Sequence, residues 1–354
     1  MRSFEHNYFL EQLISQDLLM MVRTVGEHRG RQALYQEQSP EILETLKRAA
    51  MVQSVESSNR IEGVTVAPDR LEPIVARKTR PRTRPEEEVA GYRDVLAEIH
   101  ARASRMTLSP ELILGFHGRM YAHTPEKGGE WKEKDNAIIE VLADGRQVVR
   151  FRPVSALATP GFVMKLCASY HYATDERRAE PLILIASFIL DFECIHPFAD
   201  GNGRIGRLLT LLLLYQAGYE VGRYISLERI IEESKETYYE VLLKSSQKWH
   251  EASHDLRPWW NYFLGTLIAA YREFEERVGR IASARGAKRQ MVRQAIERLP
   301  EQFTLRELRR TCPGVSPDMV RFVLRELRDE GLLTCAGRGP GAIWSKRGNI
   351  PIKR

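Results

Sequence analysis

Two strongly apolar runs lie close together in the middle of the chain and constrain the fold more than any other feature. They cover Leu182–Ile195 and Ile205–Ala217, and both have the three- and four-residue apolar spacing that is typical of buried helices. Neither reaches the ~20 residues that a membrane span needs. The short segment between them contains Gly201 and Gly203, which permit a tight backbone turn. We therefore expect two buried helices joined by a short loop, with the second helix beginning near Asn202.

Helical spacing continues through most of the chain and predicts a mainly α fold. One segment departs from it. The β-prone runs Ala137–Leu142 and Gln147–Arg152 flank the dipeptide Asp144-Gly145, which favours tight hairpin turns. This pattern predicts a β-hairpin over residues 137–152.

Changes in composition divide the chain into three regions. A helical region over residues 1–84 ends in the proline- and arginine-rich stretch Arg77–Pro85, whose prolines break helices. The largest helical region follows over residues 85–282 and contains both apolar runs. A small, basic stretch around residues 280–288 then leads into a compact tail, for which we expect a separate domain over residues 286–354.

The basic charge of the chain is concentrated in this tail. The 354 residues together have a formal net charge of +6. Residues 285–354 contain 16 basic and 7 acidic residues, so the remainder of the chain carries a small net negative charge. An anionic partner is therefore expected for the tail, and the charge balance says little about the helical body.

The chain opens without the apolar stretch of a signal peptide, and no two cysteines have C-x-x-C spacing. Isolated thiols are typical of a reducing compartment. We therefore expect a cytoplasmic protein that has no contact with membranes. The sequence leaves homo-oligomerisation open.

The loop between the two apolar runs has the features of an anion-binding site. The first N–H groups of a helix have no partner within it and carry partial positive charge, so a helix that begins near Asn202 presents them to a ligand. Gly201 and Gly203 let that ligand approach the backbone closely. Together these features predict a cradle suited to phosphate groups.

Four charged or titratable side chains of this segment fit the same purpose. Asp200 is a candidate ligand for Mg²⁺, which prefers carboxylates and phosphate oxygens. Arg204 and Arg207 can form paired hydrogen bonds with phosphate oxygens. His196, whose reference pKa is about 6.5, is a candidate general base. So many chemically suited residues in one short loop indicate a catalytic site more than a simple helix junction.

This segment, HPFADGNGRIGR over His196–Arg207, resembles the signature His-Pro-Phe-x-(Asp/Glu)-Gly-Asn-Gly-Arg-x-x-Arg of the Fic/DOC family at every defined position. The resemblance implies a Fic-type helical bundle with a β-hairpin flap. It also implies an enzyme that uses ATP and Mg²⁺ to transfer AMP to a tyrosine, threonine or serine hydroxyl of a target protein. The implied roles are deprotonation of the hydroxyl by His196, Mg²⁺ binding by Asp200, enclosure of the phosphates by Gly201, Asn202, Gly203 and Arg204, and γ-phosphate binding by Arg207.

A second motif lies upstream, within SVESSNRIEGV. Taken alone, it is a polar helix end that Gly63 would cap. Next to the first motif it resembles the family's inhibitory element, Ser/Thr-x-x-x-Glu-(Gly/Asn), with Ser58 and Glu62 at the defined positions. The resemblance implies that Glu62 pairs with Arg207 and so withholds from ATP the groups that hold its γ-phosphate.

The expected hairpin over residues 137–152 gains a role from the same resemblance. Relatives use such a flap to hold the target segment by main-chain pairing, which tolerates different sequences. Tyr238 and Tyr239 lie in a stretch that is similar to the later helices of Fic proteins, where a ring can stack on adenine. Aromatic residues at helical spacing are more often part of the core.

The basic tail has the pattern of a winged helix-turn-helix domain. Helices are expected over residues 288–299, Phe303–Arg310 and Ser316–Glu330, followed by a short β wing. On a helical wheel of the third helix, basic residues form a face apart from the apolar stripe. This face is a candidate DNA-binding surface, although winged helices also bind proteins. Its residues are Arg321, Arg325 and Arg328.

Two alternatives to AMP transfer stay open at the level of sequence. The first is removal of AMP from a modified protein, with Glu62 positioning or activating water. The second is a DNA-binding regulator in which the helical body senses nucleotide, although binding alone gives no reason for an intact His196.

Overall fold

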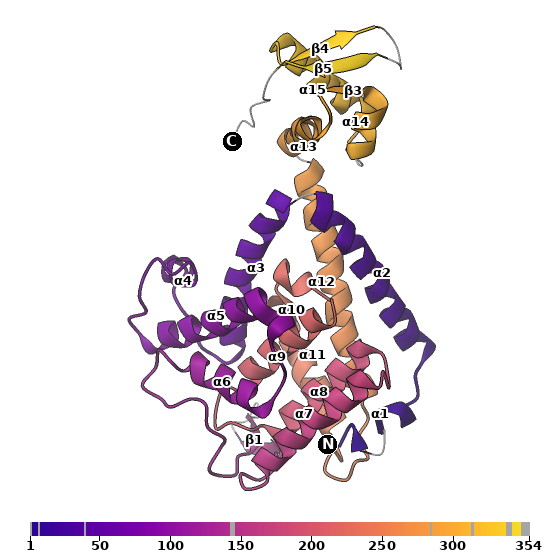
Figure 1. Ribbon diagram of the computed structural model, residues 1–354. Coiled ribbons are helices and arrows are strands. Elements are labelled where there is room, and N and C mark those ends of the chain that lie inside the picture. Colours follow the sequence, from indigo (N-terminus) through magenta and orange to yellow (C-terminus); the bar gives the residue numbers. More distant parts are fainter. Residues whose placement is uncertain are drawn as a thin grey trace. The chain divides into compact units, whose positions relative to one another are not determined.

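The structure is a computed structural model that describes residues 2–5, 8–38, 40–141, 146–283, 285–312, 315–337 and 342–347. The chain divides into two compact units, residues 1–275 and 276–354 (Figure 1). The regions expected over residues 1–84 and 85–282 do not separate at residue 84, because helices from both pack together in the first unit. The tail expected from residue 286 lies within the second unit.

In its described part, the first unit is helical apart from one two-stranded sheet. Its α-helices, in chain order, are α1 (Tyr8–Glu11), α2 (Gln16–Gln38), α3 (Pro40–Ile61), α4 (Pro68–Val75), α5 (Arg84–Arg102), α6 (Pro110–Met120), α7 (Thr159–Asp175), α8 (Pro181–Ile195), α9 (Asn202–Gln216), α10 (Leu227–Glu233), α11 (Lys235–Ser246) and α12 (Arg257–Ser283), which continues into the second unit. Two 3-10 helices, η2 (Ala103–Arg105) and η3 (Val221–Arg223), and the strands β1 (Ile138–Val141) and β2 (Gln147–Phe151) complete the unit.

The two apolar runs form the centre of this unit, as predicted. Every residue of α8 from Leu182 to Ile195 is buried, and α7, α9 and α11 pack around it (Figure 1). A helix that is apolar on all sides belongs inside a protein. Helix α9 begins at Asn202, where the sequence predicted its start.

The loop between α8 and α9 contains two residues with left-handed backbone geometry. His196 ends α8 with φ 50° and ψ 62°, and Gly201 precedes α9 with φ 80°. A β-carbon on Gly201 would lie 2.7 Å from Cε of Met120, so space as well as φ requires glycine there. A histidine in this conformation is strained by about 1–3 kcal/mol, so its surroundings must hold it in place.

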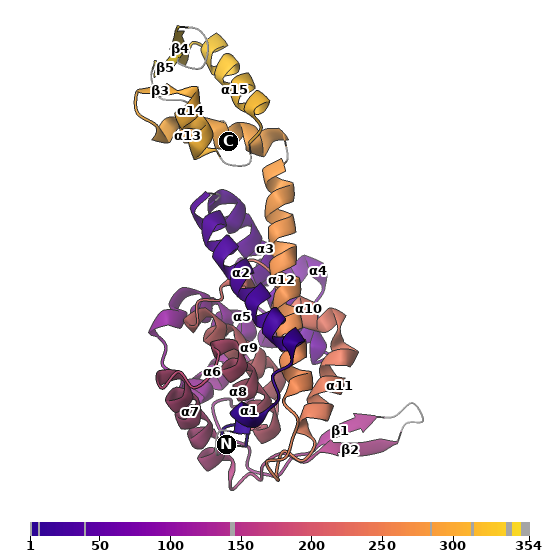
Figure 2. The ribbon, with the colours of Figure 1, turned by 90° about the vertical axis from the view of Figure 1, so that its right-hand side faces the viewer.

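The predicted hairpin strands are present. β1 pairs antiparallel with β2, with Ile139 opposite Val149, and the register shifts between Ile138 and Ile139. The predicted turn at residues 144 and 145 lies outside the described residues. Figure 2 shows the hairpin extending away from the helices. Three of its apolar side chains, those of Ile139, Val148 and Val149, are exposed.

The second unit combines helices with a three-stranded antiparallel sheet of order β3-β5-β4. Its elements are α13 (Arg285–Arg298), β3 (Gln302–Thr304), α14 (Leu305–Thr311), α15 (Pro317–Asp329), β4 (Leu333–Ala336) and β5 (Ile343–Lys346). The segment predicted as a helix over Phe303–Arg310 begins as a strand instead. Thr304 caps α14 through reciprocal hydrogen bonds with Glu307, which fixes the start of the helix at Leu305.

Helix α15 begins as the sequence predicted. The Ser316 side chain accepts a hydrogen bond from the N–H of Met319, and Pro317 occupies the first helical position. The separation of an apolar stripe from a basic face is confirmed, with Val320, Val323, Leu324 and Leu327 buried and Arg321, Arg325 and Arg328 exposed. The interpretation of this unit as a winged helix stays a prediction.

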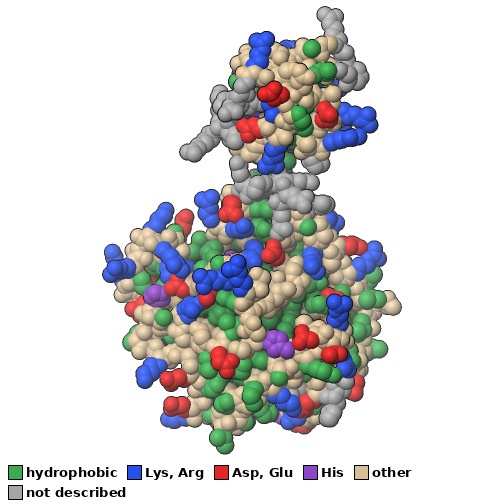
Figure 3. Space-filling model, viewed as in Figure 1, with side chains coloured by type: hydrophobic (Ala, Val, Ile, Leu, Met, Phe, Trp, Pro, Cys, Tyr) green, Lys and Arg blue, Asp and Glu red, His purple; other side chains and the backbone are tan. Residues whose placement is uncertain are grey.

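Among the described residues, no helix combines the length and the apolar character that a membrane span requires. On the face of the molecule in Figure 3, acidic and basic side chains are interspersed with hydrophobic ones.

The core of the second unit depends on α15. Replacing the fully buried Leu324 by alanine leaves a cavity, so we expect this unit to lose about 2–5 kcal/mol of unfolding free energy. Amide hydrogen exchange of residues 317–336 in the full-length chain measures this loss. Phe322 is exposed on the same helix, and Phe322→Ala is the control, with an expected change within about 0.5 kcal/mol. Equal effects of the two substitutions would contradict the packing.

Candidate active site

A cavity at the N-terminal end of α9 collects residues from α8, α11, the hairpin and the end of α3. Its polar side chains and its glycines gather around the loop before α9, whereas its apolar side chains come mainly from α8, α11 and the hairpin. The lining includes Glu62, Glu193, His196, Asp200, Gly201, Asn202, Gly203 and Arg207 on the polar side, and Ile138, Leu190, Tyr238, Tyr239, Leu242 and Leu243 on the apolar side. Most residues of the predicted catalytic site therefore share one cavity with the predicted inhibitory glutamate.

The first N–H groups of α9 are available to a ligand. Those of Asn202 and Gly203, which both line the cavity, have no backbone acceptor among the described residues. The Asn202 side chain is already used, because its Oδ1 accepts from the N–H of Phe198 at 2.8 Å and its Nδ2 donates to the Phe198 carbonyl at 2.9 Å. Asn202 can therefore serve a phosphate through its backbone, while its side chain closes the loop.

His196 is placed to act as a proton acceptor. Its Nδ1 lies 3.3 Å from the backbone carbonyl oxygen of Glu193, and donation there leaves the lone pair of Nε2 free. Burial, together with the nearby charge of Lys132, lowers the pKa of His196 to about 4. The imidazole is therefore neutral near pH 7 and able to take up a proton.

Asp200 lies at the exposed edge of the loop. Its Oδ2 accepts a hydrogen bond from the Tyr121 hydroxyl at 2.8 Å, and its Oδ1 accepts one from the Gly201 N–H at 2.7 Å. Burial opposes ionisation, but the Tyr121 hydrogen bond and the charge of Arg204 outweigh it and lower the pKa of Asp200. An ionised, accessible carboxylate beside a phosphate cradle fits Mg²⁺, which binds few carboxylates together with substrate phosphates. The described residues contain no cluster of three metal-ligating side chains, so such an ion would depend on phosphate oxygens.

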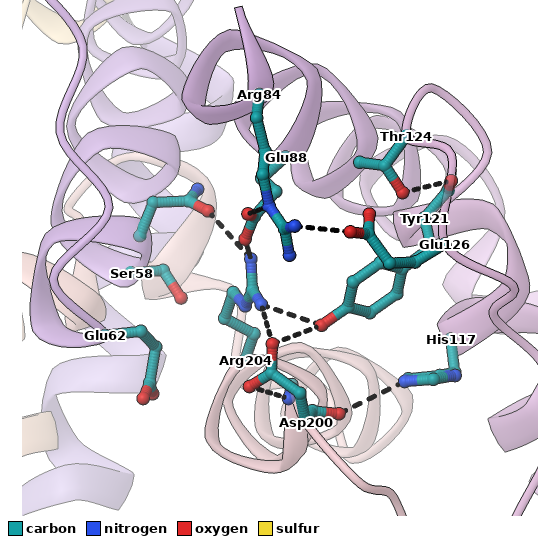
Figure 4. A network of polar contacts seen from close by, with 12 residues as sticks. Ser58, Glu62, Arg84, Glu88, His117, Tyr121, Thr124, Glu126, Asp200 and Arg204 are labelled. Carbon is teal, nitrogen blue, oxygen red and sulfur yellow. Dashed lines mark hydrogen bonds and ion pairs between the residues drawn. The ribbon is translucent and has the colours of Figure 1, made fainter.

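Arg204 is held by other side chains in the structure. It is 1% exposed and does not line the cavity. Its guanidinium donates to Glu88 at 2.5 Å, to the Tyr121 hydroxyl at 2.9 Å and to Asp200 at 3.4 Å (Figure 4). Through these contacts Arg204 positions Asp200, and its expected part in enclosing the phosphates stays a prediction.

The predicted pair of Glu62 and Arg207 is present. Oε1 of Glu62 lies 2.8 Å from Nη2 of Arg207, and the Ser58 hydroxyl and carbonyl accept two further hydrogen bonds from the same guanidinium at 2.9 Å each. A β-carbon on Gly203 would lie 2.4 Å from that Glu62 oxygen. The Glu62 carboxylate therefore lies directly against the start of α9 and occupies Arg207 at the same time.

Both predicted aromatic residues line the cavity, but in different ways. Tyr238 is buried, and its ring packs edge-on against those of Tyr239 and Trp259. Tyr239 is only half-buried, and Arg150 of the hairpin donates to its backbone carbonyl at 2.6 Å. Of the two, Tyr239 has the more accessible ring for a ligand, and Tyr238 is mainly a packing residue.

Lys132 is a site residue that the sequence did not single out. Its ammonium group donates to the carbonyl oxygens of Ile195 and His196 at 3.1 and 2.9 Å and to Oδ1 of Asn136 at 2.9 Å. Asn136 in turn donates to the Phe198 carbonyl at 3.1 Å. Lys132 therefore stabilises the end of α8 in the strained geometry of His196. Its place in the charged stretch Glu130–Asp135 gave no signal of burial, because such stretches are usually solvated.

Glu193 is the second residue that the sequence did not single out. It lines the cavity one helical turn before His196. A signal for it does exist, because Asp191 and Glu193 are the two charged residues in the otherwise apolar run that forms α8.

Comparisons with known proteins agree with this geometry. Residues 107–214 match the Fic/DOC family. A segment of 85 residues is 32% identical to a Fido domain-containing protein of Dictyostelium discoideum, and this match covers 22% of the chain and 59% of that relative. The chain thus spans somewhat more than half the length of this relative.

Solved structures show the same fold. A Fic family protein from Desulfovibrio desulfuricans G20 superposes with a TM-score of 0.62 at 22% identity, over 96% of this chain and 98% of the other. A Fic domain containing signaling protein from Bacteroides thetaiotaomicron gives a TM-score of 0.60 at 23% identity, over 72% and 96% of the two chains. Residues 107–214, with the loop at the centre of the helical fold, thus form a Fic/DOC domain.

The function of Lys132 as a clamp is testable. Lys132→Met leaves the buried Ile195 carbonyl without this donor and the His196 carbonyl with only Asn136 at 3.5 Å, so we expect a loss of about 1–3 kcal/mol in unfolding free energy. Chemical denaturation of the full-length protein, followed by the fluorescence of the buried tryptophans, measures the change. Lys134 is exposed two residues further on, and Lys134→Met is the control, expected to change the value by less than about 0.5 kcal/mol. An unchanged stability of Lys132→Met would show that the clamp is not needed.

Proposed function

We propose that this protein transfers AMP from ATP to a hydroxyl side chain of a target protein, with Mg²⁺ as cofactor, and that Glu62 inhibits the transfer. The observation that carries the proposal is the shared cavity. It brings together a neutral histidine, an ionised carboxylate, free backbone N–H groups at a helix start and an arginine. The Fic/DOC domain over residues 107–214 supports the same class of reaction.

The proposed reaction exchanges one bond to the α-phosphorus for another. The target oxygen attacks the α-phosphorus while its proton passes to Nε2 of His196, and the bond to pyrophosphate breaks. The N–H groups at the start of α9 stabilise the negative charge on the phosphate oxygens. Mg²⁺ held by Asp200 would supply charge neutralisation at the phosphates when bound. The rest of the catalysis is positioning, for which Lys132 fixes the backbone of His196.

The proposed inhibition follows from the contacts of Glu62. Its carboxylate engages Arg207 at 2.8 Å and lies against Gly203. A terminal phosphate that approaches Arg207 meets this carboxylate, and like charges at short range repel. ATP therefore has to bind without Arg207, or Glu62 has to leave first.

The hairpin supports a proposed site for the target protein. β1 and β2 form a two-stranded sheet among the described residues, so each strand has an outer edge to which a further strand can pair. The exposed Ile139, Val148 and Val149 offer apolar contact beside that edge. Pairing of this kind presents a target hydroxyl without strict demands on its sequence.

Labelled ATP with Mg²⁺ and an extract containing candidate targets tests the proposal. We expect Glu62→Gly to incorporate at least about tenfold more label into protein than wild type, since Arg207 is released. His196→Ala in the Glu62→Gly background should abolish the signal, because no base remains. If Glu62→Gly never transfers label, the proposal fails. If wild type removes label from a modified target and Glu62→Gly does not, the reverse reaction is the function.

A second proposal concerns the second unit, which we propose binds DNA through α15. Arg321, Arg325 and Arg328 are exposed on one face of this helix, apart from its buried stripe. Residues 285–354 carry 16 basic against 7 acidic residues. A helix with a basic face on a basic unit is suited to a groove of duplex DNA.

Binding of the full-length protein to duplex DNA at 50 to 200 mM salt tests this second proposal. Replacing Arg321, Arg325 and Arg328 by glutamine should weaken binding and flatten the dependence of log K on log salt by about 2–3. Arg23 is exposed on α2, and Arg23→Gln is the control that should leave both unchanged. Binding that does not respond to salt, or to the triple substitution, would contradict a DNA-binding face on α15.

A further inference from the structure

The two acidic residues of α8 differ in how their carboxylates are satisfied. Asp191 accepts hydrogen bonds from the N–H and hydroxyl of Ser3, the latter at 2.7 Å, and from the indole N–H of Trp249 at 2.5 Å. These hydrogen bonds satisfy the Asp191 carboxylate and so explain how it can be buried. Glu193 has no such partners. Its Oε1 is buried without any hydrogen bond among the described residues.

Glu193 belongs to the cavity and not to the core. The residue is 9% exposed, and it lines the same cavity as Glu62, Gly203 and Arg207. A β-carbon on Gly206 would lie 2.2 Å from its Oε1, so the carboxyl group rests against the first turns of α9. Its Oε2 lies 3.9 Å from Nδ1 of His196, too far for a hydrogen bond.

Burial disfavours the ionised form of Glu193, and the cation beside it is shared with another carboxylate. Arg207 on α9 is the cation that faces it, and that guanidinium already pairs with Glu62. Glu62 adds a like charge, and His196, at the end of α8, is neutral near pH 7. The hydroxyls of Tyr238 and Tyr239 on α11 carry no charge at this pH. A buried carboxylate without a donor or a cation of its own takes up a proton.

Burial, with the added repulsion from Glu62, raises the pKa of Glu193 to about 7, although Arg207 opposes the shift. This agrees with the missing donor at Oε1. An unpaired carbonyl oxygen of a neutral acid costs less than an unpaired carboxylate oxygen.

We propose that Glu193 is a nucleotide-contacting residue whose protonated carboxyl group donates a hydrogen bond to a phosphate oxygen. The inference rests on the proposed function in that a nucleotide occupies this cavity. The position of Glu193 favours a phosphate as the acceptor, because its carboxyl group rests against Gly206 of α9, and Arg207 of the same helix lines the cavity beside it. The apolar residues Leu242 and Leu243, which suit a base, come from α11.

Loss of the proton has a double effect on such a contact. The donated hydrogen bond disappears, and a carboxylate then faces phosphate oxygens of the same charge. Nucleotide affinity should therefore fall as the pH rises through neutrality. Glutamine at this position keeps an N–H donor of similar shape but cannot ionise, so it separates the charge effect from the packing.

The test is calorimetric binding of ATP with Mg²⁺ to full-length wild type and Glu193→Gln between pH 6 and pH 8.5. We expect wild type to lose at least about fivefold in affinity relative to Glu193→Gln over this range. Titration of the nucleotide itself is common to both proteins and cancels in the comparison. Glu193→Leu, neutral and without a donor, should bind more weakly than Glu193→Gln at every pH with the same slope. Glu236 is exposed on α11, and Glu236→Gln is the control that should follow wild type.

Each outcome has a separate meaning. Equal pH dependence in wild type and Glu193→Gln overturns the proposal for Glu193. So does a large loss of affinity in Glu193→Gln at pH 6 with the slope retained, since the carboxyl group would then act as an acceptor. Absence of ATP binding at every pH to wild type and also to Glu62→Gly, in which Arg207 is released, instead contradicts the proposed function. Repetition with AMP shows whether the contact is to the α-phosphate, in which case the difference persists, or to a terminal phosphate, in which case it vanishes.

Discussion

One buried ammonium group holds the centre of this structure together. Helix α8 ends inside the protein, where its last carbonyl groups need donors from other segments, and Lys132 donates to those of Ile195 and His196. The same contact fixes the histidine in a left-handed conformation that its side chain would otherwise resist. Its positive charge also contributes to keeping that histidine neutral. Lys132 thus affects both the backbone geometry of His196 and its pKa.

The two arginines of the central motif have different surroundings although they are three residues apart. Arg204 faces α5 and is consumed by Glu88, Tyr121 and Asp200, so it belongs to the scaffold of the loop. Arg207 faces the end of α3 and the cavity, so its partner can be exchanged. About one turn of helix thus separates Arg204, which positions the Asp200 carboxylate, from Arg207, which pairs with Glu62 at the cavity. Sequence spacing alone does not distinguish them, because both have the same chemistry.

The sequence predicted the elements that depend on neighbouring residues, but it did not predict contacts between residues that are far apart in the chain. The helix–loop–helix at Gly201, the strands of the hairpin and the cap at Ser316 all follow from the residues within a few positions, and the structure has them. The predicted start of α14 at Phe303 was wrong, because Phe303 belongs to strand β3 and Thr304, which ends that strand, also caps the helix.

The clamp by Lys132 was missed for a related reason. Its acceptors are 63 and 64 residues further along the chain, and only tertiary packing brings them together. Glu193 had a signal in the sequence, but that signal was ambiguous. An acidic residue in an apolar helix is unusual, yet Asp191 has the same signal, and its burial is explained by hydrogen bonds from Ser3 and Trp249.

The absence of a side chain at Gly203 limits which substitutions this site can accept. The volume that a side chain would fill there is shared between the Glu62 carboxylate and the predicted ligand site. A side chain at this glycine would therefore displace the Glu62 carboxylate and narrow the predicted ligand site at the same time, because both use the same space. Substitution of Ser58 or Glu62, in contrast, would free Arg207 from a different segment of the chain and leave the start of α9 intact. If the proposed inhibition holds, its strength can therefore change independently of the residues proposed to carry out the chemistry.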